Sequence, residues 1–425
     1  MRVDRGDRQN KTINKTINKN INKIRNKIGR ISAMMLVSAF LLTGCGNSEE
    51  TESSSAVPSV STEASSEELP AVTLTVKDTP AMQDANKVSL AKDGMVKNPL
   101  TGLWIDESYE NMRPISIQIS NVLPAIPQIG IARADIVYEM LVEGGITRLN
   151  AIITEYQGIE KLGPMRSARH YYDRKALEYD AIFFCWGTSI YAQADIDGGL
   201  ANLEAVDLNW EPGGFRSDDR YAPHNAYTNS DGINKRIETK GFSKEHRSGL
   251  YQRMYKFNDE FTPINGNPAD KVITKYHNNR QPWFEYNEED QLYYRFQYGE
   301  EQIDDETGEQ LAYTNVLIQF AKHTPMPDLP ELWDIDWTGE GDGYYCTGGK
   351  VIPVTWKYTN GVTRWYTSDG QELSMNPGKT WITVFQNSNR DGIVFESAKK
   401  EEDSSETDAS SDGSSDDDSD QDSDE

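Results

Sequence analysis

The stretch KLGPMRSARHYYDRKALEYDAIFFCWGT, Lys161–Thr188, decides how the middle of this chain is expected to fold. Its Gly-Pro pair marks a loop, Ser167 is a favourable helix N-cap, and Ala168–Glu178 predicts a helix. The apolar run AIFFCWGT that follows is typical of a buried strand. Two β-favouring runs flank Gly144-Gly145 before the stretch and predict a hairpin. Strand, loop, helix and strand in this order predict a βαβ crossover within an at least partly parallel sheet.

The same stretch gathers cations in a chain whose formal net charge is −25. Arg166 and Arg169 lie at the predicted helix start, where the helix dipole and unpaired N–H groups disfavour positive charge. A bound anion could compensate, because helix N-termini and arginine forks suit phosphate, sulfate and carboxylate groups. Carboxylates of the neighbouring hairpin could compensate instead, and both interpretations stay open here. The candidate internal partners are Asp135, Glu139, Glu143 and Glu155.

Three more residues complete the predicted anion site. Arg148 follows the Gly-Gly turn, and its place near the far end of its strand could leave it ~20 Å away, at ~3.3 Å per residue. His224 and Asn225 follow Pro223 in the loop-rich segment 189–248, which is expected to be functional or poorly ordered. His224 is the weak candidate for acid–base catalysis, since a loop histidine more often bonds to backbone. The predicted anion ligands are thus Arg148, Arg166, Arg169, His224 and Asn225, and no catalytic residue is assigned.

Composition sets both ends of the chain apart. Residues 1–44 join a basic segment to a short apolar run and end at the lipobox Leu42-Thr43-Gly44-Cys45, which predicts a lipoprotein signal peptide and lipid attachment at Cys45. An uncleaved membrane anchor is the alternative. Residues 45–95 predict a disordered Ser/Glu-rich tether and residues 396–425 a disordered acidic tail. We therefore expect a lipid-anchored protein on the extracytoplasmic face of the cell membrane, whose acidity disfavours nucleic acid as a partner.

Between these ends the sequence predicts an α+β protein. Residues 96–250 predict a mixed α/β domain, in which the alternation of Ile115–Ser120 indicates a half-buried strand. Residues 255–395 predict a β-rich domain, whose aromatic residues are more typical of cross-strand core pairs than of a sugar-stacking face. Cys185 and Cys346 are expected to be two buried thiols, and a disulfide between them is the alternative. The spacing of His and Cys predicts no metal site, and no motif indicates a cofactor.

Several segments of this folded part resemble the YerB-like lipoproteins. They are NPLTGL, ADIVYE with EGGITR, GPMRSARHYY, PHNAYT, TNVLIQ, and GKVIPVTWKY with DGQELSMNPGKTWI, spread over residues 96–390. The resemblance implies a two-domain, lipid-anchored bacterial protein, and it supplies no reaction because the function of that family is unknown. The first hypothesis is therefore a non-enzymatic module that binds an anionic envelope ligand or a protein partner through residues 145–230. The second is an enzyme acting on phosphorylated or glycan cell-envelope precursors, and the third is a scaffold that docks proteins through its β-rich domain.

Overall fold

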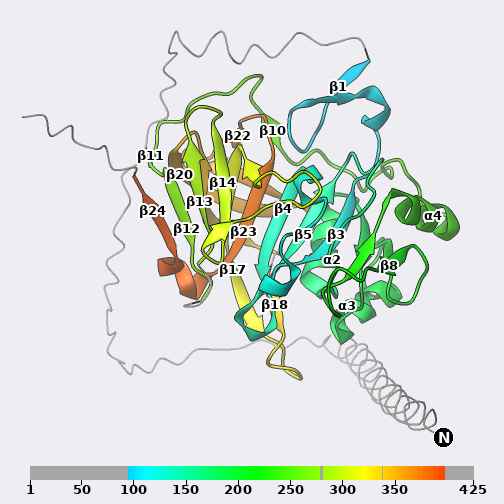
Figure 1. The fold of residues 1–425 in the computed structure, drawn as a ribbon. Helices are drawn as coiled ribbons and strands as arrows, with labels where there is room; N and C mark the ends of the chain where they lie inside the picture. Colours follow the sequence, from blue (N-terminus) through cyan, green and yellow to red (C-terminus); the bar gives the residue numbers. More distant parts are fainter. Residues whose placement is uncertain (1–93, 278–280, 337, 398–425) are drawn as a thin grey trace, which may run out of the picture. The chain divides into compact units, whose positions relative to one another are not determined.

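The computed structural model describes residues 94–397 apart from 278–280 and 337 (Figure 1). The predicted signal peptide, the predicted lipid-attachment residue Cys45, and nearly all of the predicted tether and tail lie outside those residues. Strand β1 (Met95–Lys97) pairs with β2 (Trp104–Asp106), and the last strand is β24 (Ile393–Glu396). The folded part therefore reaches one residue into each of the segments predicted as tether and tail.

A twelve-stranded mixed sheet takes strands from both halves of the chain. Its central order is β11 (Asn267–Pro268), β20 (Lys350–Thr359), β19 (Glu340–Thr347), β17 (Asn315–Pro325), β23 (Thr380–Gln386), β4 (Ile136–Leu141), β5 (Thr147–Ile153), β3 (Ile115–Ser120), β6 (Ile182–Cys185) and β7 (Ala205–Asp207), with β18 (Trp333–Asp336) beside β17 and β21 (Val362–Thr367) beside β20. The parallel pair β4–β23 joins the two halves of the chain. With its few helices, this mixed sheet confirms the predicted α+β class.

Strand β3 is buried on both faces, so the prediction of a half-buried strand is wrong. It lies between β5, which is antiparallel to it, and β6, which is parallel to it. Its polar side chains find partners inside the protein. Ser116 Oγ donates to Asn150 Oδ1 at 2.8 Å, and Gln118 Nε2 donates to the Leu149 carbonyl at 2.7 Å. The polar residues that alternate with the isoleucines of β3 therefore form hydrogen bonds inside the protein and do not form a solvent-exposed face.

Helix α2 (His170–Glu178) begins two residues later than predicted, with Arg169 at its N-cap position. The predicted cap Ser167 is wrong, because its hydroxyl donates to the Trp186 carbonyl at 3.2 Å. The predicted parallel crossover from β5 through α2 to β6 is also wrong, since β3 separates two strands that run in opposite directions. Because β6 and β7 both run parallel to β3, the partly parallel sheet is confirmed.

The segment predicted to be loop-rich contains more regular structure than expected. It holds α3 (Ile190–Ala194), the π turn η6 (Asp195–Gly199), strand β7, the hairpin β8 (Gly214–Arg216) and β9 (Ala226–Thr228), and helix α4 (Ser230–Lys240). The sequence does carry signals for α4. The Asn229 side chain accepts the Gly232 N–H at 2.8 Å, and Gly241 ends the helix with φ +67°.

A second sheet of six strands belongs to the C-terminal half. It is formed by β15 (Glu300–Glu301), β14 (Leu292–Gln297), β13 (Trp283–Asn287), β12 (Lys271–Thr274) and β24, with β16 (Ala312–Tyr313) beside β14. The short pair β10 (Lys256–Phe257) and β22 (Ser374–Met375) lies apart from it. The 3-10 turns in the described part of the chain are η2 (Glu107–Tyr109), η3 (Leu123–Ala125), η4 (Ile131–Arg133), η5 (Glu143–Gly145) and η7 (Asn387–Gly392). The described residues from 255 onward hold no α-helix, as the β-rich prediction implied.

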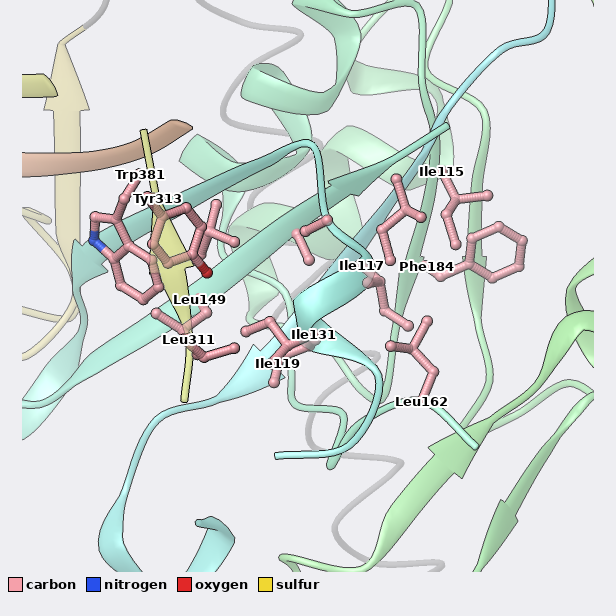
Figure 2. Close-up of a cluster of buried hydrophobic side chains, with 14 of the residues drawn as sticks. Ile115, Ile117, Ile119, Ile131, Leu149, Leu162, Phe184, Leu311, Tyr313 and Trp381 are labelled. Carbon is pink, nitrogen blue, oxygen red and sulfur yellow. The ribbon is translucent and has the colours of Figure 1, made fainter. Parts of the chain in front are cut away.

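Two hydrophobic clusters unite both halves of the chain. Figure 2 shows part of the first, in which the β3 isoleucines continue through Leu149 toward Tyr313 and Trp381 of the C-terminal half. Burying each such large side chain contributes about 1.5–3 kcal/mol. Trp356 and Trp365 face each other across β20 and β21 and are buried, which is the core role predicted for these aromatics. Cys185 and Cys346 are both buried and unpaired.

Candidate functional site

Arg148 and Arg166 lie at one edge of the sheet, at the carboxyl ends of β3, β6 and β7. Because β5 is antiparallel to β3, Arg148 near the start of β5 pairs with Ser120, the last residue of β3. The chain after β5 then runs back along the sheet, so that the Arg166 N–H donates to the Gln118 carbonyl at 3.0 Å. The expectation that Arg148 could lie ~20 Å from the site, at ~3.3 Å per strand residue, is therefore wrong.

One carboxylate serves two of the three arginines. Glu143, in the turn between β4 and β5, pairs with Arg148 at 3.0 Å and accepts Nε of Arg169 at 3.0 Å. Arg148 also donates to the Ser167 carbonyl and Arg169 to the Ala168 carbonyl. Burial alone would raise the pKa of the Glu143 carboxyl, but Arg148 and Arg169 hold it below its ordinary value.

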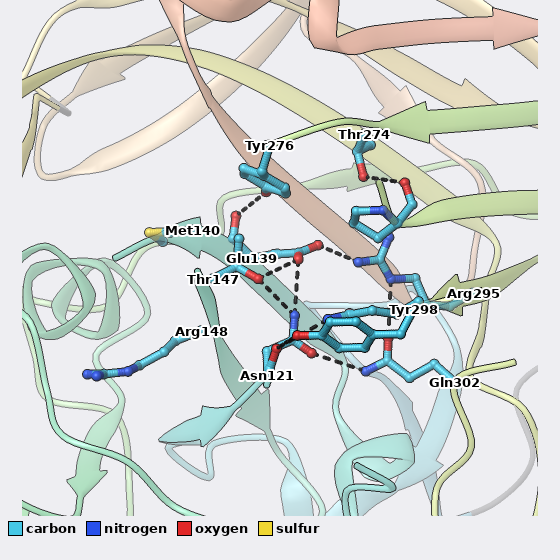
Figure 3. Close-up of polar contacts among 12 residues, drawn as sticks. Asn121, Glu139, Met140, Thr147, Arg148, Thr274, Tyr276, Arg295, Tyr298 and Gln302 are labelled. Atoms are coloured by element: carbon cyan, nitrogen blue, oxygen red, sulfur yellow. Dashed lines mark hydrogen bonds and ion pairs between the residues drawn. The ribbon is translucent and has the colours of Figure 1, made fainter. Parts of the chain in front are cut away.

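The other carboxylates considered as internal partners point elsewhere. Asp135 accepts the Thr154 N–H at 2.7 Å, and Glu139 forms an ion pair with Arg295 at 2.7 Å. Glu155 is exposed. Figure 3 shows Arg148 extending away from the Glu139 network. The internal salt-bridge interpretation thus accounts for Arg148 and Arg169 through Glu143.

Arg166 differs from its two neighbours. Its partly exposed guanidinium makes no hydrogen bond or ion pair with any residue that the structure describes. Burial lowers its pKa, Glu143 opposes that shift, and the Arg169 charge adds to it. Burial likewise lowers the pKa of Arg148 to about 10, with contributions from the charges of Arg169 and Arg166. Three arginines around one glutamate leave an excess of positive charge at this edge.

The β8–β9 hairpin brings His224 to the same place. The chain beside it is fixed by the Met165 N–H, which donates to the Ala226 carbonyl at 2.7 Å. Burial lowers the pKa of His224, and the charges of Arg166 and Arg220 lower it further. Its Nδ1 is buried and has no partner within the described ranges. His224 therefore lies within electrostatic reach of the unpaired Arg166, whose charge favours the neutral imidazole.

Asn225 has a supporting position. Its amide donates to the Ser217 carbonyl at 2.9 Å, and its oxygen accepts Nη1 of Arg216 at 2.7 Å. The Arg216 guanidinium lies 5.0 Å from the centre of the Trp186 ring. Asn225 thus has an indirect role, because it holds the Arg216 guanidinium over the indole ring of Trp186.

Two residues that sequence reasoning missed lie between the predicted ones. The Trp186 N–H donates to the Arg166 carbonyl at 3.1 Å, and the Gly187 N–H donates to Asp207 Oδ1 at 2.6 Å. Trp186 Nε1 and Asp207 Oδ2 are buried with no partner in the part of the chain that is described. Both residues lie at the carboxyl ends of parallel strands, which is where open α/β sheets usually bind their ligands. That signal becomes usable only once the strand order is known.

Within residues 94–397, outside the gaps, no three or more His, Cys, Asp and Glu side chains come together to hold a metal ion. The helices of that same range are all too short or too polar to cross a membrane.

Comparison with known proteins gives consistent matches over the folded part. Residues 100–243 match the family described as "Protein of unknown function (DUF3048) N-terminal domain", and residues 272–382 match its C-terminal domain. The putative lipoprotein YerB of Bacillus subtilis (strain 168) is 33% identical over 301 residues, which are 68% of this chain and 86% of that protein. The crystal structure of YerB from Bacillus subtilis superposes with a TM-score of 0.63 at 31% identity, covering 71% of this chain and 99% of that one. This chain belongs to the DUF3048 family, the family of YerB, as the resemblance predicted.

Proposed function

We propose that this chain is a lipid-anchored protein of the extracytoplasmic membrane face that binds an anionic ligand of the cell envelope around Arg166. The anchor is supported by the lipobox at Cys45 and by the description of its relative YerB as a putative lipoprotein. The binding role rests on one observation: Arg166 is unpaired within the described residues, although Arg148 and Arg169 beside it share a single carboxylate.

The arrangement around Arg166 suits an anion for physical reasons. Glu143 and the carbonyl groups of the loop hold Arg148 and Arg169 in place, so little side-chain freedom would be lost on binding. An arginine fork can hold a phosphate or carboxylate by two parallel hydrogen bonds. His224, on the facing hairpin, is able to donate or accept one more.

Replacement of Arg166 by alanine should weaken the binding of inorganic pyrophosphate about tenfold to a hundredfold, since a charge-assisted hydrogen bond contributes about 1.5–3 kcal/mol. The unfolding midpoint should change little because Arg166 has no partner to lose within the described structure. Titration calorimetry and thermal unfolding measure the two quantities. Arg253→Ala removes an exposed arginine ahead of β10 and is the matched control. Equal pyrophosphate affinity in both variants would refute the site.

Glu143→Gln should lower the stability of the fold while raising its affinity for pyrophosphate. The change removes the counter-ion of Arg148 and Arg169, so stability should fall by about 1–3 kcal/mol. It also removes a negative charge that acts on Arg166, so pyrophosphate should bind more tightly. The exposed pair of Glu340 with Lys357 supplies the control Glu340→Gln, for which neither quantity should move. Weaker pyrophosphate binding by Glu143→Gln would contradict an anion site.

An enzyme of phosphorylated or glycan envelope precursors is the second candidate, favoured by His224. Burial and two arginine charges lower the pKa of His224, which keeps its imidazole neutral and able to accept a proton at neutral pH. Phosphate release from such a precursor, measured by phosphorus NMR, should then depend on His224 and stop in His224→Gln. If the wild-type chain leaves the precursor unchanged, the enzyme candidate is refuted and the binding role is the candidate that remains.

A further inference from the structure

We infer that the anion held at Arg166 is part of a sugar: the ligand is a phosphorylated sugar, or a glycan that carries such groups. This inference rests on the proposed anion site and narrows the class of its ligand. Two independent features at the same edge of the sheet point to a ligand rich in hydroxyl groups. They are the unpartnered polar atoms beside Arg166 and the exposed aromatic rings around it.

Asp207 is the first of these polar groups. It is 8% exposed, and its Oδ1 already accepts the N–H groups of Gly187 at 2.6 Å and Asn209 at 2.9 Å. Its Oδ2 is buried without a partner in the described chain. A carboxylate oxygen accepts hydrogen bonds and cannot donate one, so this atom needs a donor. A phosphate dianion offers acceptors alone, whereas a sugar hydroxyl donates and accepts.

Trp186 supplies the complementary group. Its indole Nε1 is a donor, is buried, and is likewise without a partner among the described residues. A hydroxyl group that donates to Asp207 could accept from a neighbouring donor of this kind. The Trp186-Gly187 dipeptide also fixes the geometry, because it bonds to the Arg166 carbonyl on one side and to the Asp207 carboxylate on the other. The anion and hydroxyl sites are therefore adjacent.

Exposed apolar side chains gather at the same edge of the sheet. Seven large hydrophobic side chains are exposed in the described part of the chain; three of them follow strand ends at this edge and two lie on the neighbouring β8–β9 hairpin. The five are Leu123 after β3, Ile190 after β6, Trp210 after β7, and Phe215 and Tyr221 on the β8–β9 hairpin. Such a concentration marks a binding surface.

Trp210 and Tyr221 are the most exposed aromatic rings of this group, at 80% and 66%. The Trp210 N–H donates to the Asp207 carbonyl at 3.1 Å, which holds that turn beside the hydroxyl site. The Tyr221 ring lies edge-on to His224 with their centres 5.6 Å apart. Flat rings that stand in solvent beside polar groups can stack on the C–H faces of sugar rings. Amphipathic aromatic side chains suit such mixed contacts.

The test compares four probes on the detergent-solubilised full chain by titration calorimetry. They are inorganic phosphate, glycerol 3-phosphate, glucose 1-phosphate and N-acetylglucosamine 1-phosphate. We expect at least one of the two sugar phosphates to bind at least tenfold more tightly than phosphate and than glycerol 3-phosphate, which has hydroxyl groups and no ring. Arg166→Ala should weaken the binding of all four probes.

Variants outside the anion site should abolish the tighter binding of the sugar phosphates (the sugar advantage) and leave the binding of inorganic phosphate unchanged. Asp207→Asn keeps the Oδ1 acceptor and should bring the sugar phosphates to the affinity of phosphate. Trp210→Ala should do the same, whereas Trp210→Phe should retain most of the advantage. Trp210 is largely exposed, so its variants will fold even if Asp207→Asn does not. Leu103→Ala, at an exposed residue away from this edge, is the control and should change no affinity.

Each result decides something different. Phosphate binding that depends on Arg166, with both sugar phosphates no tighter than phosphate, overturns this inference and leaves the proposed anion site standing. A sugar advantage that survives both Asp207→Asn and Trp210→Ala also overturns it. Absence of binding by every probe overturns the anion site and this inference together.

Discussion

Replacement of Arg295 by leucine is expected to lower the free energy of unfolding by about 3–5 kcal/mol, because it leaves a buried carboxylate without its counter-ion. Arg295 on β14 and Glu139 on β4 are both fully buried, and their ion pair measures 2.7 Å. Figure 3 shows the network around them, in which Glu139 Oε1 also accepts Asn121 Nδ2 at 3.1 Å and Thr147 Oγ1 at 2.8 Å. The pair connects the central sheet to the second sheet.

The arginine is held on its other sides by aromatic rings. Its guanidinium carbon lies 4.6 Å from the ring centres of both Phe284 and Trp381. Burial lowers the pKa of Arg295, and the charge of Glu139 opposes that shift. A leucine would keep apolar contact with the rings and lose the charge. The loss in Arg295→Leu should therefore come from Glu139 and not from packing.

Chemical denaturation of matched variants can establish this. The double variant Glu139→Leu with Arg295→Leu should recover part of the lost stability, since no lone buried charge remains. Arg390→Ala breaks an exposed pair with Asp342, measured at 2.7 Å, and should cost about 0–1 kcal/mol. A loss for Arg295→Leu no larger than for Arg390→Ala would show that the buried pair does not hold the two sheets together.

Asp173→Asn should stabilise the protein at neutral and alkaline pH. Asp173 lies fully buried on α2, and burial, with a contribution from Asp195, raises its pKa to about 9. In the unfolded chain the carboxyl ionises near pH 4, so between these values the folded state holds one more proton. Stability therefore falls as the pH rises through this window, by about 1.4 kcal/mol per pH unit at most. Removing the ionisable group could return up to about 4 kcal/mol at pH 7.

The measurement is the unfolding free energy of wild type and Asp173→Asn between pH 4 and pH 9. The two curves should meet at the acid end and separate steadily as the pH rises. Asp391→Asn changes an exposed aspartate near the end of the folded part and serves as the control. Parallel curves for Asp173→Asn and wild type would mean that the Asp173 carboxyl ionises in the folded chain as readily as in the unfolded one.

Local sequence signals predicted much of the secondary structure. They failed where the outcome depended on contacts with residues far away in the sequence. The hairpin around Gly144-Gly145 and the buried strand after α2 formed as expected, because turn residues and apolar runs act over a few positions. The half-buried prediction for Ile115–Ser120 failed, because burial of a strand's second face depends on what packs there. Ser167 failed as a cap because its hydroxyl bonded to Trp186, 19 residues away.

The candidate site shows the same division. Its arginines and His224 could be named from charge and loop composition, since unpaired cations at a helix start are a local anomaly. Asp207 and Trp186 could not, because nothing in their local sequence sets them apart until β6 and β7 align beside β3. The pairing of Glu143 with Arg148 and Arg169 also depended on the return of the chain along the sheet.

The sequence by itself indicated the family, the mixed α+β class and the identity of the cations, and it carries the patterns from which secretion and lipidation are predicted. These follow from composition and short patterns, which act through nearest neighbours along the chain. The separation of residues 96–250 and 255–395 into two domains stays a prediction, as does the scaffold role. Tertiary structure alone decided that Arg148 of β5 and Arg169 share Glu143, while Arg166 stays unpaired among the described residues. That outcome depends on strand order and direction, which bring together charges that lie far apart along the chain.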